Sequence, residues 1–271
     1  MNTKVKICGI TSLEDALAAL DAGADFLGLI FAQSSPRRVE IDAAKEIIAG
    51  IAGRAQIVGV FKDQELEFVS ELAVSLKLDY VQCHGKETVD YVRRLPIKVI
   101  KVLELEGVSE SDFGAGVAAG AAEGSGVGIA SSSTAGSEES SATSADVSLT
   151  VSEETVAPAA AATSTIGSLA QEWRADAHFL LFDRPKLLSD PEWYKRAVQE
   201  LLAAQPLPLP YFFAGGLSAE NVGEVVAALH PFAVDVASSV EASAGKKDVA
   251  KMIDFCKAVK KDSGGVSACA H

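Results

Sequence analysis

The sequence has few metal-ligating side chains, and none of them is spaced as a metal site requires. Its four cysteines, at positions 8, 83, 256 and 269, form no Cys-x-x-Cys pair, and its four histidines show no ligand spacing. A structural zinc site and a disulfide framework are therefore excluded as interpretations. No apolar run is long enough to span a bilayer, and no signal or transit peptide is visible. We expect a cytoplasmic protein with reduced thiols, no metal and no membrane association.

Positive charge and aromatic side chains are missing from one long segment. No Lys or Arg lies between Val102 and Trp173, although eleven acidic residues do, and the rest of the chain is nearly neutral with 24 basic and 26 acidic residues. No basic patch therefore indicates a nucleic-acid partner. Residues 107–165 are mostly Ala, Gly, Ser, Thr and Glu, a composition too poor in large apolar side chains to fold. We predict a disordered surface insertion there; an acidic docking segment is the alternative.

Outside this segment, short β-branched or aromatic runs alternate with helix-length amphipathic stretches. The predicted strands are 5–8, 26–30, 56–60, 80–82, 98–102, 178–182, 211–214 and 233–236. The predicted helices are 12–23, 42–51, 64–76, 87–95, 167–175, 190–204, 218–230 and 246–261. Alternating strands and helices imply a parallel sheet, and eight strands favour a closed (β/α)₈ TIM barrel over a doubly wound open sheet. We predict one α/β domain over residues 1–271, with the insertion following strand five.

The active site of such a barrel lies at the carboxyl ends of its strands. Two of the residues predicted at these ends suit proton transfer: the Cys8 thiol as a base and the Asp183 carboxyl as an acid. A buried cysteine that only fills space remains the alternative for Cys8. Cys8 as a nucleophile would need a nearby histidine, and His84 is the one candidate.

An anion site is also indicated at the strand ends. Gly215 and Gly216 follow an apolar strand and precede a helix, an arrangement in which backbone N–H groups can hold a phosphate. A tight turn that merely needs glycine is the competing interpretation. Arg37 could form a forked contact with a carboxylate or phosphate, or it could simply be solvated.

Several segments resemble phosphoribosylanthranilate isomerase of tryptophan biosynthesis. They include "VKICGITSLEDALAALDAGADFLGLIF", "SSPRRV", "DYVQCHGKE", "FFAGGLSAENV" and "VDVASSVEASAGKKD", and the resemblance spans nearly all of the chain outside the insertion. It implies a cofactor-free Amadori rearrangement of N-(5-phosphoribosyl)anthranilate to 1-(2-carboxyphenylamino)-1-deoxyribulose 5-phosphate. A small phosphorylated substrate is then the expected partner, and the oligomeric state, monomer or homodimer, stays open.

The resemblance also implies roles for single residues. Cys8 matches the general base and Asp183 the general acid, while Arg37 would hold the anthranilate carboxylate. The phosphate would be held by backbone N–H groups, and Asp235 and His84 would have supporting roles. The residues implied for phosphate binding are Gly215, Gly216, Ser238 and Ser239.

The sequence departs from the family pattern at two loops near the phosphate. The family's glycine-rich loop after the strand-six Asp is replaced by a stretch without glycine, "FDRPKLLSDPEWYK". In the eighth loop the family usually has Ser-Ser-Gly-Val-Glu, whereas this chain has Ala-Ser-Ser-Val-Glu over 237–241, so Ser239 stands in the place of the glycine. Arg184 or Lys186 could supply charge instead. These departures keep two alternatives open: a related barrel enzyme acting on another phosphosugar, and a non-catalytic descendant with an interaction segment.

Overall fold

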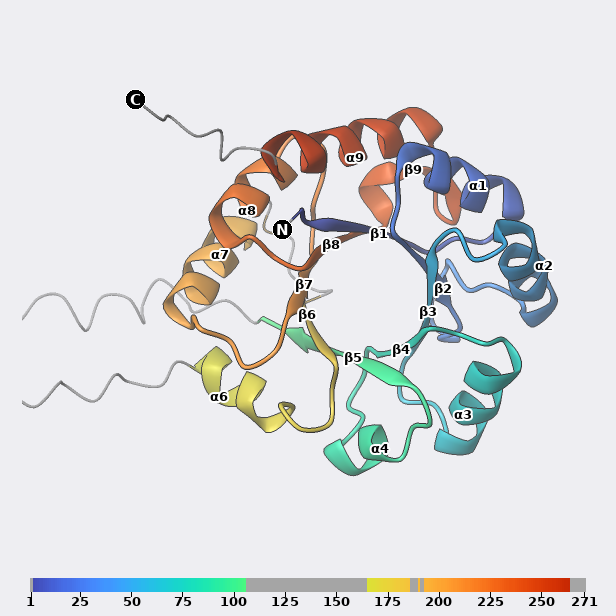
Figure 1. Ribbon diagram of the computed structural model, residues 1–271, viewed down its shortest axis with the longest axis horizontal. Coiled ribbons are helices and arrows are strands. Elements are labelled where there is room, and N and C mark those ends of the chain that lie inside the picture. Colours follow the sequence, from blue (N-terminus) through green and yellow to red (C-terminus); the bar gives the residue numbers. More distant parts are fainter. Residues whose placement is uncertain (1, 106–164, 186–189, 191–192, 264–271) are drawn as a thin grey trace, which may run out of the picture. The chain divides into compact units, whose positions relative to one another are not determined.

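The computed structural model describes residues 2–105, 165–185, 190 and 193–263. Its eight parallel strands pair in sequence order, and β1 also pairs with β8, which closes the barrel (Figure 1). The strands are β1 (Lys4–Cys8), β2 (Phe26–Ile30), β3 (Gln56–Phe61), β4 (Tyr80–Cys83), β5 (Lys98–Glu104), β6 (Phe179–Asp183), β7 (Tyr211–Phe213) and β8 (Ala233–Val236). The predicted (β/α)₈ barrel is confirmed.

Helices surround the barrel (Figure 1). They are α1 (Leu13–Ala22), α2 (Ile41–Ile51), α3 (Leu66–Ser75), α4 (Val89–Arg93), α6 (Thr165–Glu172), α7 (Trp193–Ala203), α8 (Val222–Leu229) and α9 (Val249–Ser263). Local signals set some of their ends. The Ser12 side chain accepts a hydrogen bond from the Asp15 N–H at the start of α1, and Gly23 ends that helix with a φ of 104°.

Most element ends lie within one to four residues of the sequence prediction, and two of the differences affect how the chain is divided. The helix expected over 246–261 begins at Val249, because Lys246–Lys247 form a strand, β10, that pairs antiparallel with β9 (Glu241–Ser243). Gly245, with a φ of 80°, makes the turn between them. Thr165 already belongs to α6, so it is not part of the insertion. The rest of the predicted insertion, 107–164, lies outside the described residues.

Successive side chains of each strand point to opposite faces of the sheet, so the buried side chains form two hydrophobic cores, one outside and one inside the barrel. Side chains that point outward, such as Val5 and Ile7 of β1, pack against the helices. Side chains that point inward fill the barrel, and at its amino-terminal end they form an aromatic plug. Its members contact one another with ring centroids 4.5–6.2 Å apart: Phe26, Tyr80, Phe179, Phe212 and Phe232. These rings fill the barrel at the amino-terminal ends of the strands, so the interior is open to a ligand at the carboxyl ends.

None of the described helices is both long and apolar enough to cross a membrane.

Candidate active site

A cavity of about 470 Å³ lies at the carboxyl ends of the strands. All nine residues that the sequence predicted for the site line it: Cys8, Arg37, His84, Asp183, Gly215, Gly216, Asp235, Ser238 and Ser239. They come from loops and strand ends all around the barrel, so closure of the barrel is what brings them together.

The Cys8 thiol lies at the end of β1 in space that its neighbour in β2 leaves open. Cys8 pairs with Gly28, and a Cβ atom at position 28 would lie only 2.7 Å from the Cys8 Sγ atom. Cys8 itself is 6% exposed. Glycine at position 28 is therefore required for the thiol to keep its place facing the cavity.

A buried ion pair lies directly beside the thiol. Lys6 Nζ is 2.9 Å from Asp235 Oδ2, with side-chain exposures of 0% and 9%. Strand alternation puts Lys6 on the same inward face as Cys8, and the β1–β8 register puts it opposite Asp235. Among the described residues, Asp235 Oδ1 is buried with no hydrogen-bond partner. Asp235 thus retains an acceptor atom in the wall of the cavity.

Burial and charge act against each other at this cluster. Burial raises the pKa of the Cys8 thiol above its ordinary value, and Asp235 adds to the rise, while Lys6 and Lys247 oppose it. Burial lowers the pKa of Lys6, but the charge of Asp235 and its hydrogen bond to Lys6 act against burial, and the pKa is raised overall. The thiol is therefore protonated at rest, with two lysines near it to stabilise the thiolate when it forms.

Arg37 is held by an acidic partner that the sequence reading missed. Its Nε and Nη2 atoms donate to the two carboxylate oxygens of Glu241, at 2.8 and 2.9 Å. Lys247 Nζ donates to the same carboxylate at 3.0 Å and to the carbonyl of Ala237. Burial would raise the pKa of Glu241, but the hydrogen bonds from Arg37 and Lys247 lower it overall. Gly9, with a φ of 79°, lets the Arg37 chain pass, since a Cβ there would lie 2.8 Å from Arg37 Cδ.

Asp183 ends β6 on the other side of the cavity. Burial raises its pKa to about 6; the N–H of Arg184, which donates to Asp183 Oδ1 at 2.8 Å, opposes the rise, and the charges of Asp235 and Glu104 add to it. His84 Nε2 lies 3.5 Å from Asp183 Oδ2 and 4.0 Å from Glu104 Oε1. Asp183 therefore retains its proton to a higher pH than an exposed Asp would.

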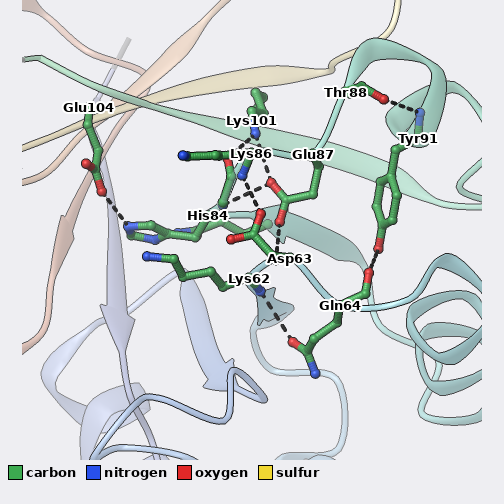
Figure 2. A network of polar contacts seen from close by, with 12 residues as sticks. Lys62, Asp63, Gln64, His84, Lys86, Glu87, Thr88, Tyr91, Lys101 and Glu104 are labelled. Atoms are coloured by element: carbon green, nitrogen blue, oxygen red, sulfur yellow. Dashed lines mark hydrogen bonds and ion pairs between the residues drawn. The ribbon is translucent and has the colours of Figure 1, made fainter.

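A polar network supports His84 and the loops after β3 and β4 (Figure 2). Glu87 accepts hydrogen bonds from the N–H groups of Asp63 and Gly85 and from Lys101 Nζ, each at 2.9 Å. Lys101 and Glu87 are almost completely buried, and the Lys101 ammonium lies 5.2 Å from the centre of the Trp173 ring. A buried pair with this many partners holds the surrounding loops in one arrangement. Within the described residues, no group of His, Cys, Asp and Glu is arranged to hold a metal ion.

The glycine pair differs in detail from the predicted anion cradle. Gly215 and Gly216 have φ values of 93° and 75° and line the cavity, but a turn over 218–221 separates them from α8. The helix predicted from residue 218 begins only at Val222, and Ser218 Oγ accepts from the Glu220 N–H within the turn before it. No backbone acceptor is found for the N–H of Gly215 or Gly216 within the described part of the chain. An anion held at these glycines would therefore meet loop N–H groups and not a helix end.

Comparison with known proteins agrees with this geometry. The N-(5'-phosphoribosyl)anthranilate isomerase family matches residues 5–118 and 136–258. The isomerase of Geobacter metallireducens is 30% identical over 261 residues, covering 95% of this chain and 98% of the relative. The crystal structure of the isomerase from Thermus thermophilus is 29% identical, with a TM-score of 0.63 and coverage of 96% and 99% of the two chains.

A second solved structure shows a relative with a ligand. It is a phosphoribosyl anthranilate isomerase in complex with reduced 1-(o-carboxyphenylamino)-1-deoxyribulose 5-phosphate, 26% identical, with a TM-score of 0.63 and coverage of 96% of this chain and 99% of the other. Family match, relatives and barrel architecture agree along almost the whole chain. The chain therefore belongs to the N-(5'-phosphoribosyl)anthranilate isomerase family.

Proposed function

We propose that Asp183 and Cys8 are the acid and base with which this chain isomerises N-(5'-phosphoribosyl)anthranilate to 1-(2-carboxyphenylamino)-1-deoxyribulose 5-phosphate, a step of tryptophan biosynthesis. The observation that carries the proposal is the placement of a proton-retaining carboxyl and a lysine-flanked thiol in the wall of one cavity. Both groups are needed because the rearrangement adds a proton at one atom of the sugar and removes one at another.

In the first step, Asp183 gives its proton to the ring oxygen of the ribose. The C1–O bond breaks, the nitrogen lone pair forms a C=N bond, and a protonated Schiff base results. The pKa of about 6 at Asp183 allows this carboxyl to donate a proton near neutral pH more readily than a carboxyl of ordinary acidity. His84, 3.5 Å from the carboxylate, is placed to steady it after the proton has left.

In the second step, the Cys8 thiolate removes the proton from C2. The electron pair of the C2–H bond moves into a C1–C2 double bond and neutralises the iminium nitrogen, giving an enolamine that becomes the ketone. The pKa of Cys8 is raised by burial, so the thiolate is a minor species but a strong base when present. Lys6 and Lys247 supply the positive charge that allows it to form.

The two ends of the substrate need separate anion sites. Arg37 donates hydrogen bonds to Glu241 from Nε and Nη2, and in this proposal its remaining amino group donates to the anthranilate carboxylate. The N–H groups near Gly215, Gly216, Ser238 and Ser239 face the phosphate. Asp235 supports the base through Lys6. A cytoplasmic location is part of the same proposal, supported by the free thiols of Cys8, Cys83 and Cys256.

An assay with freshly prepared N-(5'-phosphoribosyl)anthranilate tests the whole proposal. The purified chain should convert it, and Cys8→Ala and Asp183→Asn should each lower kcat by roughly 10²- to 10⁴-fold, the scale of an acid or base catalyst. Arg54→Met, at an exposed position in the loop between α2 and β3, serves as the control and should keep full activity. Absence of turnover by the folded chain rejects the function, and near-normal kcat in either variant rejects that residue's role.

A further inference from the structure

Arg184 is a cation in the cavity wall with no acidic side-chain partner among the described residues. It follows Asp183 directly, is partly buried and lines the cavity. Its Nη1 atom lies 3.5 Å from the carbonyl oxygen of Asp190, and no carboxylate of the described residues lies within ion-pair distance. A guanidinium held against a cavity without a counter-charge is poised to bind an anion.

The other cations in the cavity wall or just behind it show how unusual this is. Arg37 is engaged by Glu241 through two hydrogen bonds, and Lys6 by Asp235 through one. Lys62 also lines the cavity with no acidic partner among the described residues, but it follows β3 and has no glycine loop beside it. Of the cations that the structure describes at this cavity, Arg184 is the one that has no acidic partner and also lies beside a set of backbone N–H donors.

Those donors belong to the glycine pair after β7. A Cβ atom at Gly216 would lie 3.5 Å from Arg184 Nη1 and 3.7 Å from Cζ, so the guanidinium is in contact distance of that loop. A Cβ at Gly215 would lie 2.7 Å from the Arg184 backbone nitrogen. Two successive turn residues whose N–H groups have no backbone acceptor among the described residues can line a concave anion site, and a guanidinium at its rim adds charge and a planar fork of donors.

We propose that Arg184 binds the phosphate of the substrate, a phosphomonoester dianion, with its guanidinium group. The inference rests on the proposed function for the identity of the substrate, and on Arg184 and the glycine pair for the place of the phosphate. It accounts for the stretch after Asp183, in which the chain has an arginine and no glycine before Trp193. A charged side chain does here what a loop of backbone donors would otherwise do.

The placement also connects phosphate and acid. The backbone N–H of Arg184 donates to Asp183 Oδ1 at 2.8 Å, while its side chain reaches the glycine loop. One residue thus contacts both the catalytic carboxyl and the phosphate site, so the sugar ring between them is positioned relative to its acid.

Kinetic variants at this position test the inference. Arg184→Met should raise KM by roughly 10- to 100-fold with a smaller change in kcat, the scale expected for a hydrogen bond to a charged group. Arg184→Lys retains the charge without the fork and should fall between Arg184→Met and the unmodified chain. Arg54→Met removes an exposed arginine and should leave KM unchanged.

Binding of inorganic phosphate, measured by calorimetry, separates this inference from the proposed function. The unmodified chain should bind phosphate, and Arg184→Met should weaken that binding at least about 10-fold. A folded Arg184→Met chain with unchanged KM and unchanged phosphate affinity overturns the inference, whatever the activity. If phosphate binding depends on Arg184 while the chain does not turn over the isomerase substrate, the proposed function fails and the phosphate site stands.

Discussion

The two sides of the cavity treat charge differently. On the β1–β8 side, Lys6, Asp235, Glu241 and Lys247 have side-chain exposures of 9% or less and form ion pairs with one another or with Arg37. On the β6–β7 side, Asp183 is 22% exposed and the Arg184 guanidinium has no acidic partner among the described residues.

The difference matches what each side has to do in the proposed reaction. A thiol must be ionised inside the barrel, where a lone thiolate is costly, so fixed positive charge stands ready beside it. The acid must exchange a proton with the substrate and the phosphate must enter and leave, so this side keeps a carboxyl of raised pKa and an open cation. In this proposal the β1–β8 side stabilises a buried thiolate, and the β6–β7 side transfers a proton and binds and releases the phosphate.

Removing one member of the ion pairs on the β1–β8 side should have the largest effect on stability. Glu241→Ala leaves Lys247 buried at 0% exposure and frees the Arg37 fork, and losing one partner of a buried pair costs about 3–5 kcal/mol in the free energy of unfolding. Urea denaturation measures it. Glu46→Ala, at an exposed position on α2, is the matched control and should change stability by under about 0.5 kcal/mol. A loss below about 1 kcal/mol for Glu241→Ala would contradict the ion-pair account.

The pH dependence of kcat/KM sharpens the comparison further. The pKa of Asp183 is about 6 and that of Cys8 is raised, so the reactive form, with Asp183 protonated and Cys8 ionised, is always a minor species. Between the two pKa values its population is constant, because loss of the acid proton and gain of thiolate cancel. Below about pH 6, where Asp183 is already protonated, kcat/KM should fall about tenfold per pH unit.

Asp183→Asn removes the lower of these two titrations. The residual kcat/KM of this variant should follow the thiolate fraction alone and rise about tenfold per pH unit from pH 6 to 8, where the unmodified chain is flat. Steady-state rates in buffers of constant ionic strength measure both profiles. A flat profile for Asp183→Asn over this interval would show that Cys8 is not the titrating base.

The smallest effect is expected from removing residues 107–164 and joining the ends by a short Gly/Ser linker. None of the residues assigned to the site lies in this segment, and β5 and β6 pair directly from Ile100↔Phe179 to Glu104↔Asp183. We expect kcat/KM within about twofold of the full chain, on the reasoning that loop length alone changes stability little. Loss of activity would assign the segment a role in the catalytic unit.

The strands and the positions of the proposed acid and base were predictable because their signals are local. Each β-branched run is bounded by turn residues or caps, as at Ser12 and Gly23, and the barrel rule then turns strand ends into site residues. Cys8, Asp183 and Arg37 are strand-end or loop residues of this kind, and the structure brings them to one cavity.

The charges behind the catalytic pair were not predicted because their partners are distant in sequence. Lys6 and Asp235 are 229 residues apart and meet only when β1 pairs with β8. Glu241 and Lys247 belong to a hairpin that the sequence analysis interpreted partly as the start of a helix. Two signals in the sequence could have been used. Lys6 lies two residues before Cys8 and therefore points to the same side of the strand. Gly245 lies between two short segments at a position where a hairpin turn needs a residue with positive φ.

The junction between β5 and β6 divides the site as well as the chain. Cys8, Arg37 and His84 precede it, whereas Asp183, Arg184 and both glycines follow it. A polypeptide ending at Leu105 would hold the proposed base and the proposed site for the anthranilate carboxylate. One starting at Thr165 would hold the proposed acid and the proposed phosphate site. Neither half contains a complete proton-transfer pair, so turnover by the two mixed halves would report their reassembly with no label or reporter attached.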